Sequence, residues 1–324
     1  MTSAARRRGE DLLLRAQRGE AAGLGQLITA LESRSDVGLA IRGKVHAAGG
    51  GAHVIGVTGA PGSGKSTLVG ALAREVRARG RRVGIIAVDP SSSRTGGAIL
   101  GDRIRMQDHT VDRGTFMRSM SSRGSVGGVS RATVDAVAAL DAAGWDVVIV
   151  ETVGAGQADV EIIQIAKTTV VVSVPGLGDD IQAIKAGLLE VADVHVVNKA
   201  DRPDANKTVA DLLAMLTLGG PQAEGRWAVP VLATSSLTSD SVPELVDALE
   251  AHLGWLTDSG ERERRERTAA VARIRAIAKD LLIEQLDDPA RGEGFDDVVD
   301  DVVARRLDPH EAATLLIDRL AVAS

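Results

Sequence analysis

Several residue types that build common functional sites are missing or rare in this chain of 324 residues. There is no cysteine, which excludes disulfide bonds and thiolate metal sites. The six histidines are scattered without the spacing of metal ligands, so each is better explained as a structural residue. Tyrosine is absent and phenylalanine and tryptophan total only five, so alanine, valine, leucine and isoleucine must form the core. Such a core is typical of a buried parallel β-sheet.

Long apolar runs are missing as well. None reaches the roughly 18–20 residues that a membrane-spanning helix requires. Arg6, Arg7 and Arg8 near the start are not followed by the apolar core of a signal peptide. We therefore expect a cytoplasmic protein that does not insert into a membrane. The formal net charge of −6 disfavours nucleic acid as a partner.

The most informative segment is VIGVTGAPGSGKST at residues 54–67, where a β-branched run leads into a glycine-rich turn. The turn matches G-x-x-x-x-G-K-S/T, the P-loop pattern that wraps backbone N–H groups around a phosphate at the start of a helix. Lys65 is expected to reach the β- and γ-phosphates, and to be an exposed loop side chain without nucleotide. The Ser66 hydroxyl is expected to bind Mg²⁺. The predicted phosphate-binding residues are Gly59, Ala60, Pro61, Gly62, Ser63, Gly64, Lys65, Ser66 and Thr67.

A second polar motif follows the apolar run VADVHVVNKAD at residues 191–201. It places Asn198, Lys199 and Asp201 at the carboxyl end of a strand, where open α/β sheets bind ligands. The Asp201 carboxylate can accept from guanine N1–H and the exocyclic amine together, a donor pair that adenine lacks. Asn198 can bridge the base and the P-loop, while the Lys199 stem covers the ring. With Ser235 and Ser236 in a polar loop after another apolar run, these residues predict a GTP and GDP site rather than an ATP site.

Two further strand-like runs end in carboxylates. VGIIAVDPSSS leads to Asp89, and WDVVIVETVGAGQ leads to Glu151. Parallel strands place such carboxylates beside the P-loop, where Mg²⁺ keeps several waters and takes few protein ligands. Both are therefore expected to hold waters of Mg²⁺, with a turn cap before Pro90 as the alternative role of Asp89. Gly154 and Gly156 leave the backbone able to approach the γ-phosphate and to move on hydrolysis.

Five blocks together resemble the MeaB family, GTPases that act as chaperones of adenosylcobalamin-dependent methylmalonyl-CoA mutase. The blocks are GAPGSGKST, DPSSSRTGGAILGDRIRM, ETVGAGQ, PGLGDDIQAIKAG and NKAD, and the resemblance extends over almost the whole chain. It implies a GTPase that gates cofactor loading and protects or reactivates the mutase, with no cobalamin bound directly. It also implies a homodimer with the mutase as partner; whether a cobalamin adenosyltransferase joins the complex stays open.

The resemblance carries roles to particular residues. Asp89 and Asp102 match acidic positions of the family's first switch, and Glu151 matches the magnesium-associated glutamate of the second. The implied catalytic set is Lys65, Asp89, Asp102, Glu151 and Lys185, and the implied magnesium set is Ser66, Asp89, Asp102 and Glu151.

A third switch, which relays the nucleotide state to the mutase, is matched by Asp179, Asp180, Gln182 and Lys185. Lys185 also matches a lysine implicated in stimulated hydrolysis. One departure is Ala98, where the family pattern leads us to expect serine, and it affects only a minor hydrogen bond of the first switch. Without an evident water-orienting glutamine or arginine finger, intrinsic turnover is expected to be slow.

Alternating strand-like and helix-like segments predict an α/β fold, a P-loop NTPase with a mostly parallel sheet flanked by helices. Strands are expected near residues 53–58, 82–88, 146–150, 169–174, 193–198 and 229–233. Residues 1–51 are predicted to be an N-terminal helical segment ending in a flexible joint of three glycines. Residues 52–257 are predicted to be the GTPase domain, and 258–324 a C-terminal helical arm for dimerisation.

Two patterns define the expected arm. An apolar stripe at helical spacing runs through Val271, Ile274, Ile277 and Leu281. Asp308, Pro309 and Glu311 then supply an N-cap, a first-turn proline and a third-position glutamate, which predict the start of a final helix. A stripe outside the main sheet must pack against the GTPase domain or against a second copy of the chain.

Three other functions compete with this hypothesis. A GTPase that delivers nickel would need a cluster of cysteine or histidine, and the sequence has none. A kinase linked to amino-acid transport would need an acceptor pocket and a base, for which the chain offers no separate domain. A nucleotide-binding scaffold without hydrolysis stays open, because Gln157 is not obviously placed to orient water.

Overall fold

The computed structural model describes residues 2–89, 112–121, 131–152, 162–176, 191–218, 225–286 and 294–322. The chain divides into two compact units, Met1–Glu263 and Arg264–Ser324. None of the helices in the described ranges combines the length and the apolar character that a membrane span requires.

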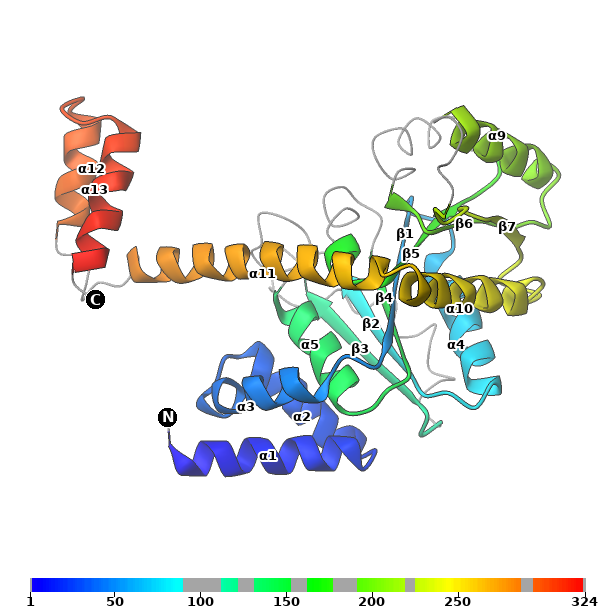
Figure 1. The fold of residues 1–324 in the computed structure, drawn as a ribbon, viewed down its shortest axis with the longest axis horizontal. Coiled ribbons are helices and arrows are strands. Elements are labelled where there is room, and N and C mark those ends of the chain that lie inside the picture. The colour runs from blue at the N-terminus through cyan, green and yellow to red at the C-terminus, as the bar shows by residue number, and fades with distance from the viewer. Residues whose placement is uncertain are drawn as a thin grey trace. The chain divides into compact units, whose positions relative to one another are not determined.

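Seven strands form one parallel sheet in the first unit (Figure 1). In spatial order they are β3 (Thr115–Ser121), β2 (Val83–Asp89), β4 (Val147–Thr152), β1 (His53–Gly59), β5 (Thr168–Ser173), β6 (Val194–Asn198) and β7 (Val231–Thr234). Valine, isoleucine and threonine dominate the central strands and are buried on both faces, as in parallel sheets enclosed by helices. Because all strands run in the same direction, their carboxyl ends share one edge of the sheet.

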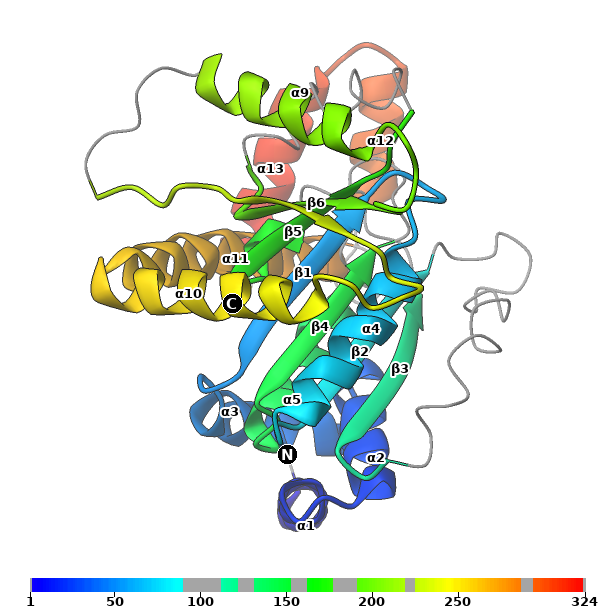
Figure 2. The same cartoon turned by 90° about the vertical axis from the view of Figure 1, so that its right-hand side faces the viewer.

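Helices cover both faces of this sheet. Four of them pack on one face around Val54, Ile86 and Val148, namely α1 (Ser3–Gln17), α2 (Ala21–Glu32), α3 (Asp36–Ala48) and α5 (Arg131–Ala142). On the other face, α4 (Lys65–Ala78) and α10 (Val242–Asp258) pack around residues such as Ile55 and Ile85 (Figure 2). Successive side chains of a strand point to opposite faces, which is why neighbouring residues such as Val54 and Ile55 belong to different cores. Two further elements of this unit are the short 3₁₀ helix η2 (Ile162–Gln164) and α9 (Ala205–Leu218), which packs against β6 and β7.

The predicted α/β fold is confirmed, and six of the seven strands lie at the predicted positions. The strand that was not predicted is β3, because its sequence TFMRSMS lacks a continuous apolar run. β3 is an edge strand, and in its described part most side chains are only half buried. Arg118 in this strand donates to Gly25 O and to a carboxylate oxygen of Glu32 on α2. A polar edge strand of this kind carries little periodic signal in the sequence.

The glycine segment expected to be a flexible joint has several hydrogen-bond partners in the structure. The Asp141 carboxylate accepts from the backbone N–H groups of Gly50 and Ala52. The carbonyl oxygen of Gly50 accepts from Lys167 and Arg262. This segment is therefore tied to α5 and to the start of the sheet.

The second unit contains most of α11 (Glu261–Leu286), together with α12 (Phe295–Val303) and α13 (Pro309–Val322). The predicted start of the last helix has the expected cap. The Asp308 carboxylate accepts from the N–H groups of His310 and Glu311 at 2.7 and 3.3 Å. None of the α11 side chains is buried within this single chain.

Candidate nucleotide-binding site

The P-loop joins β1 to α4 at the carboxyl edge of the sheet. Gly59 ends the strand with φ +142°, and a Cβ on it would stand 2.1 Å from the carbonyl oxygen of Val172 in β5. Gly64 is the N-cap of α4 with φ +87°, a left-handed conformation that glycine adopts without strain. As a glycine it brings no side-chain oxygen to the start of the helix, and an anion is the partner that such a helix start suits. The geometry of this loop therefore suits an anion such as a phosphate at the start of α4.

Lys65 lies inside this loop and is not the exposed side chain that the sequence led us to expect. It is only 6% exposed, and its ammonium donates to the carbonyl oxygens of Gly59 and Ala60 at 2.7 and 2.9 Å. The ammonium thus joins the last residue of β1 and the first residue of the loop after it. The positive charge is thereby held next to the helix start.

Ser66, in the first turn of α4, contacts Glu151, which lies on the neighbouring strand β4. The Ser66 hydroxyl donates to the Glu151 carboxylate at 2.6 Å, and Glu151 is buried at the end of β4. β4 pairs directly with β1, which is why its terminal carboxylate comes beside the P-loop. A serine hydroxyl and a carboxylate are hard oxygen donors of the kind that Mg²⁺ prefers, so these residues fit a magnesium site.

Asn198, the last residue of β6, joins two loops. Its side-chain amide donates to Ser63 O at 2.8 Å, and its carbonyl oxygen accepts from the backbone N–H of Ser236 at 3.2 Å. The side chain is buried, and Gly64 leaves room for it, because a Cβ on that glycine would lie 2.4 Å from the amide nitrogen. Asn198 thus fixes the P-loop and the loop after β7 to the end of β6.

Lys199 and Asp201 border an open pocket beside this junction. Lys199 has φ +60°, and its ammonium donates to Gly62 O at 2.9 Å, so its stem extends from β6 to the P-loop. The Ser235 hydroxyl is 3.4 Å from the Asp201 carboxylate. The pocket has a volume of ≈ 230 Å³ and is lined by residues of the P-loop, the NKxD motif and the loop after β7: Gly64, Thr67, Asn198, Lys199, Asp201, Arg202, Ser235, Ser236 and Leu237.

Two pocket residues were not among those predicted. Arg202 directly follows the NKxD motif, and Leu237 directly follows the two serines. Leu237 is 82% exposed, an unusual position for a leucine in an otherwise polar loop. That isolated leucine in TSSLTSD is the sequence signal from which this wall of the pocket could have been predicted.

The structure brings together the predicted residues of the P-loop, Glu151, the NKxD motif and both serines. Asp89 is the last residue of β2, which pairs with β4, but its side chain lies outside what the structure describes. The predictions for Asp102, Asp179, Asp180, Gln182 and Lys185 also fall outside the described residues, as do those for Ala98, Gly154, Gly156 and Gln157.

Comparison with known proteins shows which proteins this chain is similar to. Residues 24–290 match the family described as methylmalonyl Co-A mutase-associated GTPase MeaB. A putative GTPase of Pyrococcus horikoshii is 43% identical over 312 residues, which cover 96% of this chain and 98% of that protein. The mitochondrial methylmalonic aciduria type A homolog of Caenorhabditis elegans is 34% identical over 215 residues, covering 65% of this chain and 54% of that protein. The crystal structure of a LAO/AO transport system kinase covers 99% of both chains, with a TM-score of 0.69 and 26% identity.

Proposed function

Because this chain belongs to the MeaB family of P-loop GTPases, we propose that it hydrolyses GTP as a chaperone of adenosylcobalamin-dependent methylmalonyl-CoA mutase. The observation that carries the nucleotide part of this proposal is Asn198, which ties the phosphate loop to the base-side loop. The mutase part rests on the description of the family and on the name of the nematode relative. The client, the cytoplasmic location and the absence of directly bound cobalamin are parts of the proposal.

Base selection is assigned to the pocket beside Asp201. Its carboxylate would accept from N1–H and the exocyclic amine of guanine, and Lys199 would cover one face of the ring. Ser235 and Ser236 support the loop at the opposite side, where a backbone N–H would meet the guanine oxygen. Adenine offers a single amine and no N1–H, so it would leave part of the carboxylate unpaired.

Phosphate binding is assigned to the P-loop. The N–H groups at the start of α4 would bind the β-phosphate, and Lys65 would exchange its bonds to the loop carbonyls for phosphate oxygens. Ser66, Asp89, Asp102 and Glu151 would hold Mg²⁺ directly or through water, and the ion would neutralise charge on the phosphates. Glu151 would then orient water near the γ-phosphate, since it is already placed beside Ser66.

Turnover is slow if no further group stabilises the transition state. We assign this stabilisation to the third switch. Asp179, Asp180, Gln182 and Lys185 would change position with the nucleotide, and Lys185 would approach the phosphates when the mutase binds. An added positive charge of this kind accelerates other GTPases by about 10³–10⁵. The nucleotide state could then be read by the mutase during cofactor loading or repair, with an adenosyltransferase as a further candidate partner.

The domain organisation belongs to the same proposal. We assign the GTPase domain to residues 52–257, after an N-terminal helical segment at 1–51. The arm at 258–324 is assigned to dimerisation with a second copy, because α11 leaves its apolar residues exposed in the single chain.

A kinase linked to transport is the second candidate, because the solved structure named as a transport system kinase shares the fold over its whole length. The two candidates differ in where the γ-phosphate goes. A GTPase releases inorganic phosphate, whereas a kinase transfers the phosphoryl group to an acceptor. Nickel delivery gains no support, since the part of the chain that the structure describes contains no cluster of three metal-binding side chains.

Co-purification tests the proposed client. The protein would be isolated from native extract with GDP or with a non-hydrolysable GTP analogue. Recovery of a large cobalamin-containing subunit, in an amount that depends on the nucleotide, is expected. Recovery of a membrane transport component in its place would favour the kinase.

A further inference from the structure

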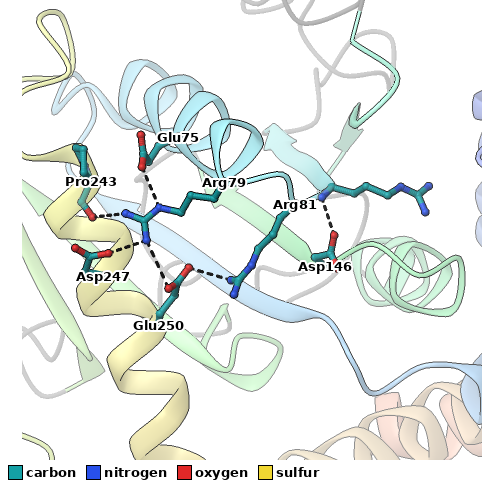
Figure 3. A network of polar contacts seen from close by, with 8 residues as sticks. Glu75, Arg79, Arg81, Asp146, Pro243, Asp247 and Glu250 are labelled. Atoms are coloured by element: carbon teal, nitrogen blue, oxygen red, sulfur yellow. Dashed lines mark hydrogen bonds and ion pairs between the residues drawn. The ribbon is translucent and has the colours of Figure 1, made fainter.

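One arginine at the end of the P-loop helix bonds to four partners on two helices (Figure 3). Arg79 is the C-cap of α4, and its Nε donates to the Glu75 carboxylate of the same helix at 2.9 Å. Its Nη1 donates to Asp247 at 2.7 Å and lies 3.5 Å from a carboxylate oxygen of Glu250, both on α10. Its Nη2 donates to the backbone carbonyl oxygen of Pro243 at 3.0 Å. Every nitrogen of the guanidinium group is therefore used, and three of the four partners belong to α10.

The helix held in this way begins directly after the loop that borders the base pocket. Ser235 and Ser236 line the pocket, and the loop closes where Ser235 N–H donates to Asp240 O at 3.3 Å. Ser241, with φ +58°, then leads into α10 at Val242. At its other end the loop continues from β7, a four-residue strand at the edge of the described sheet, next to β6. The position of α10 is thus one anchor of the loop, beside β7 and the bonds of Ser236 to Asn198.

The partner that α10 packs against is the phosphate-binding helix itself. Val242, Leu245 and Leu249 share one buried core with residues of α4 such as Leu68 and Leu72. Apolar packing holds two helices together but allows small shifts along their length, since it is not directional. Several hydrogen bonds with fixed directions prevent such shifts and so fix how α10 lies along α4. A guanidinium group can supply these bonds because its donors form a planar fork, which an ammonium group lacks.

We infer that Arg79 is a positioning residue of the nucleotide site. It fixes α10 on α4, and together with Asn198 it thereby sets the distance between the base-side loop Ser235–Asp240 and the P-loop. This inference rests on the proposed function, because it takes the pocket beside Asp201 as the guanine site. The consequence is that Arg79 affects recognition of the base, whereas the affinity for phosphate alone does not depend on it.

Calorimetric titration with two ligands tests this consequence. GDP occupies both the P-loop and the base pocket, whereas inorganic tripolyphosphate occupies the P-loop alone. Arg79→Leu is expected to weaken GDP binding on the order of tenfold, and to leave tripolyphosphate binding within about twofold of the wild type. Arg79→Lys keeps the charge and the stem but not the fork, so it is expected to weaken GDP by about three- to tenfold.

The chain offers a matched control two residues away. Arg77 is also near the end of α4 and is similarly exposed, 27% against 25% for Arg79. Its side chain pairs with Asp112 and donates to the backbone carbonyl oxygen of Arg81, and in the described part of the chain it makes no bond to α10. Arg77→Leu is therefore expected to leave the ratio of GDP to tripolyphosphate affinity unchanged. This control separates the position of the base-side loop from a general effect of losing a surface arginine.

Three results would overturn the inference. Unchanged GDP affinity in both Arg79 variants would do so, as would equal weakening of GDP and tripolyphosphate, which would assign Arg79 to the P-loop helix alone. Wild-type protein that binds tripolyphosphate but not GDP would overturn the proposed function and this inference together, and it would be seen before any variant is made. If Arg79→Leu fails to fold by circular dichroism, Arg79→Lys decides the question.

Discussion

In the proposed function, Lys65 is the residue on which phosphate binding depends most directly. Its ammonium already lies inside the P-loop, bonded to the carbonyl oxygens of Gly59 and Ala60. Lys65→Ala is expected to abolish GTP turnover, because the charge that compensates the phosphates is lost. It should also lower the free energy of unfolding by about 1–2 kcal/mol, since the carbonyl oxygens of Gly59 and Ala60 lose a donor.

Turnover and urea unfolding of the purified variant measure both effects. Lys44→Ala, which removes an exposed lysine paired with Glu10 on another helix, serves as the control. Undiminished hydrolysis by Lys65→Ala would contradict the assignment of the site.

Asp201 tests the base assignment independently. Asp201→Asn exchanges a pair of acceptors for one acceptor and one donor, which opposes guanine N1–H but suits xanthine. Loss of the charged pair of hydrogen bonds should weaken GTP binding by about 2–4 kcal/mol, and XTP binding should improve. Affinities of both nucleotides, with the exposed Asp211→Asn on α9 as control, provide the measurement. If neither nucleotide responds, the NKxD motif does not read the base in this protein.

Much of the site could be predicted at this scale, because two short motifs specify chemistry by residue type and spacing. The exposure of Lys65 was predicted wrongly, since the sequence does not show that the carbonyl oxygens of Gly59 and Ala60 accept from its ammonium. Arg202 and Leu237 were missed because they belong to no motif and reach the pocket only through the path of the folded loops. The roles of Asp102 and Lys185 stay predictions.

At the scale of elements, a buried polar chain links β1, β5 and α10 at the amino edge of the sheet. His53 Nε2 lies 2.7 Å from the Thr168 hydroxyl, which lies 2.8 Å from His252 Nδ1. His252 Nε2 is 3.2 Å from the Asp193 carboxylate. The four side chains thus form one buried polar chain from β1 to the start of β6.

Burial is the main cause that lowers the pKa of His53 from 6.5 to about 3, and the positive charge of Lys167 acts in the same direction. The unfolded chain therefore binds a proton near pH 6.5 that the folded chain does not bind until about pH 3. The contribution of neutral His53 to the free energy of unfolding is fully present above about pH 6.5 and is lost as the pH falls toward 3. The free energy of unfolding should fall by about 1.4 kcal/mol per pH unit from this group.

His53→Gln should remove this part of the slope, whereas His46→Gln, which replaces an exposed histidine on α3, should retain it. Urea unfolding at about pH 7, 6 and 5 gives the slopes. Equal slopes for the wild type and His53→Gln would show that His53 does not titrate as its burial requires.

The elements themselves were predicted unevenly, for physical reasons. Central parallel strands are buried on both faces and so form continuous runs of valine and isoleucine, which the sequence shows plainly. The edge strand β3 includes Arg118 and several half-buried positions, and its pairing with β2 comes from tertiary contacts. The register between α4 and α10, set by Arg79 and its partners, has no local signal at all.

At the scale of the whole molecule, α11 exposes apolar side chains whose burial against another surface would be favourable. Ile274 is 67% exposed in the single chain, and Val271 and Leu281 of the same stripe are exposed as well. If a second copy covers this stripe, Ile274→Glu should raise the dimer dissociation constant by about 100-fold or more, because each copy loses one buried isoleucine. Sedimentation velocity measures the effect, with Lys279→Glu as a charge control. A wild-type chain that stays monomeric at micromolar concentration would contradict the proposed dimer.

The proposal that this GTPase serves a mutase is tested most directly by GTP turnover with and without its cognate methylmalonyl-CoA mutase. Turnover of the wild type alone should be slow, and the mutase should raise it by about tenfold or more if it brings a positive charge to the phosphates. Lys185→Ala should keep the basal rate and the nucleotide affinity but lose most of the stimulation. Equal stimulation of the variant would exclude Lys185 from the mechanism. A wild-type rate that does not change when the mutase is added would contradict the proposed chaperone function.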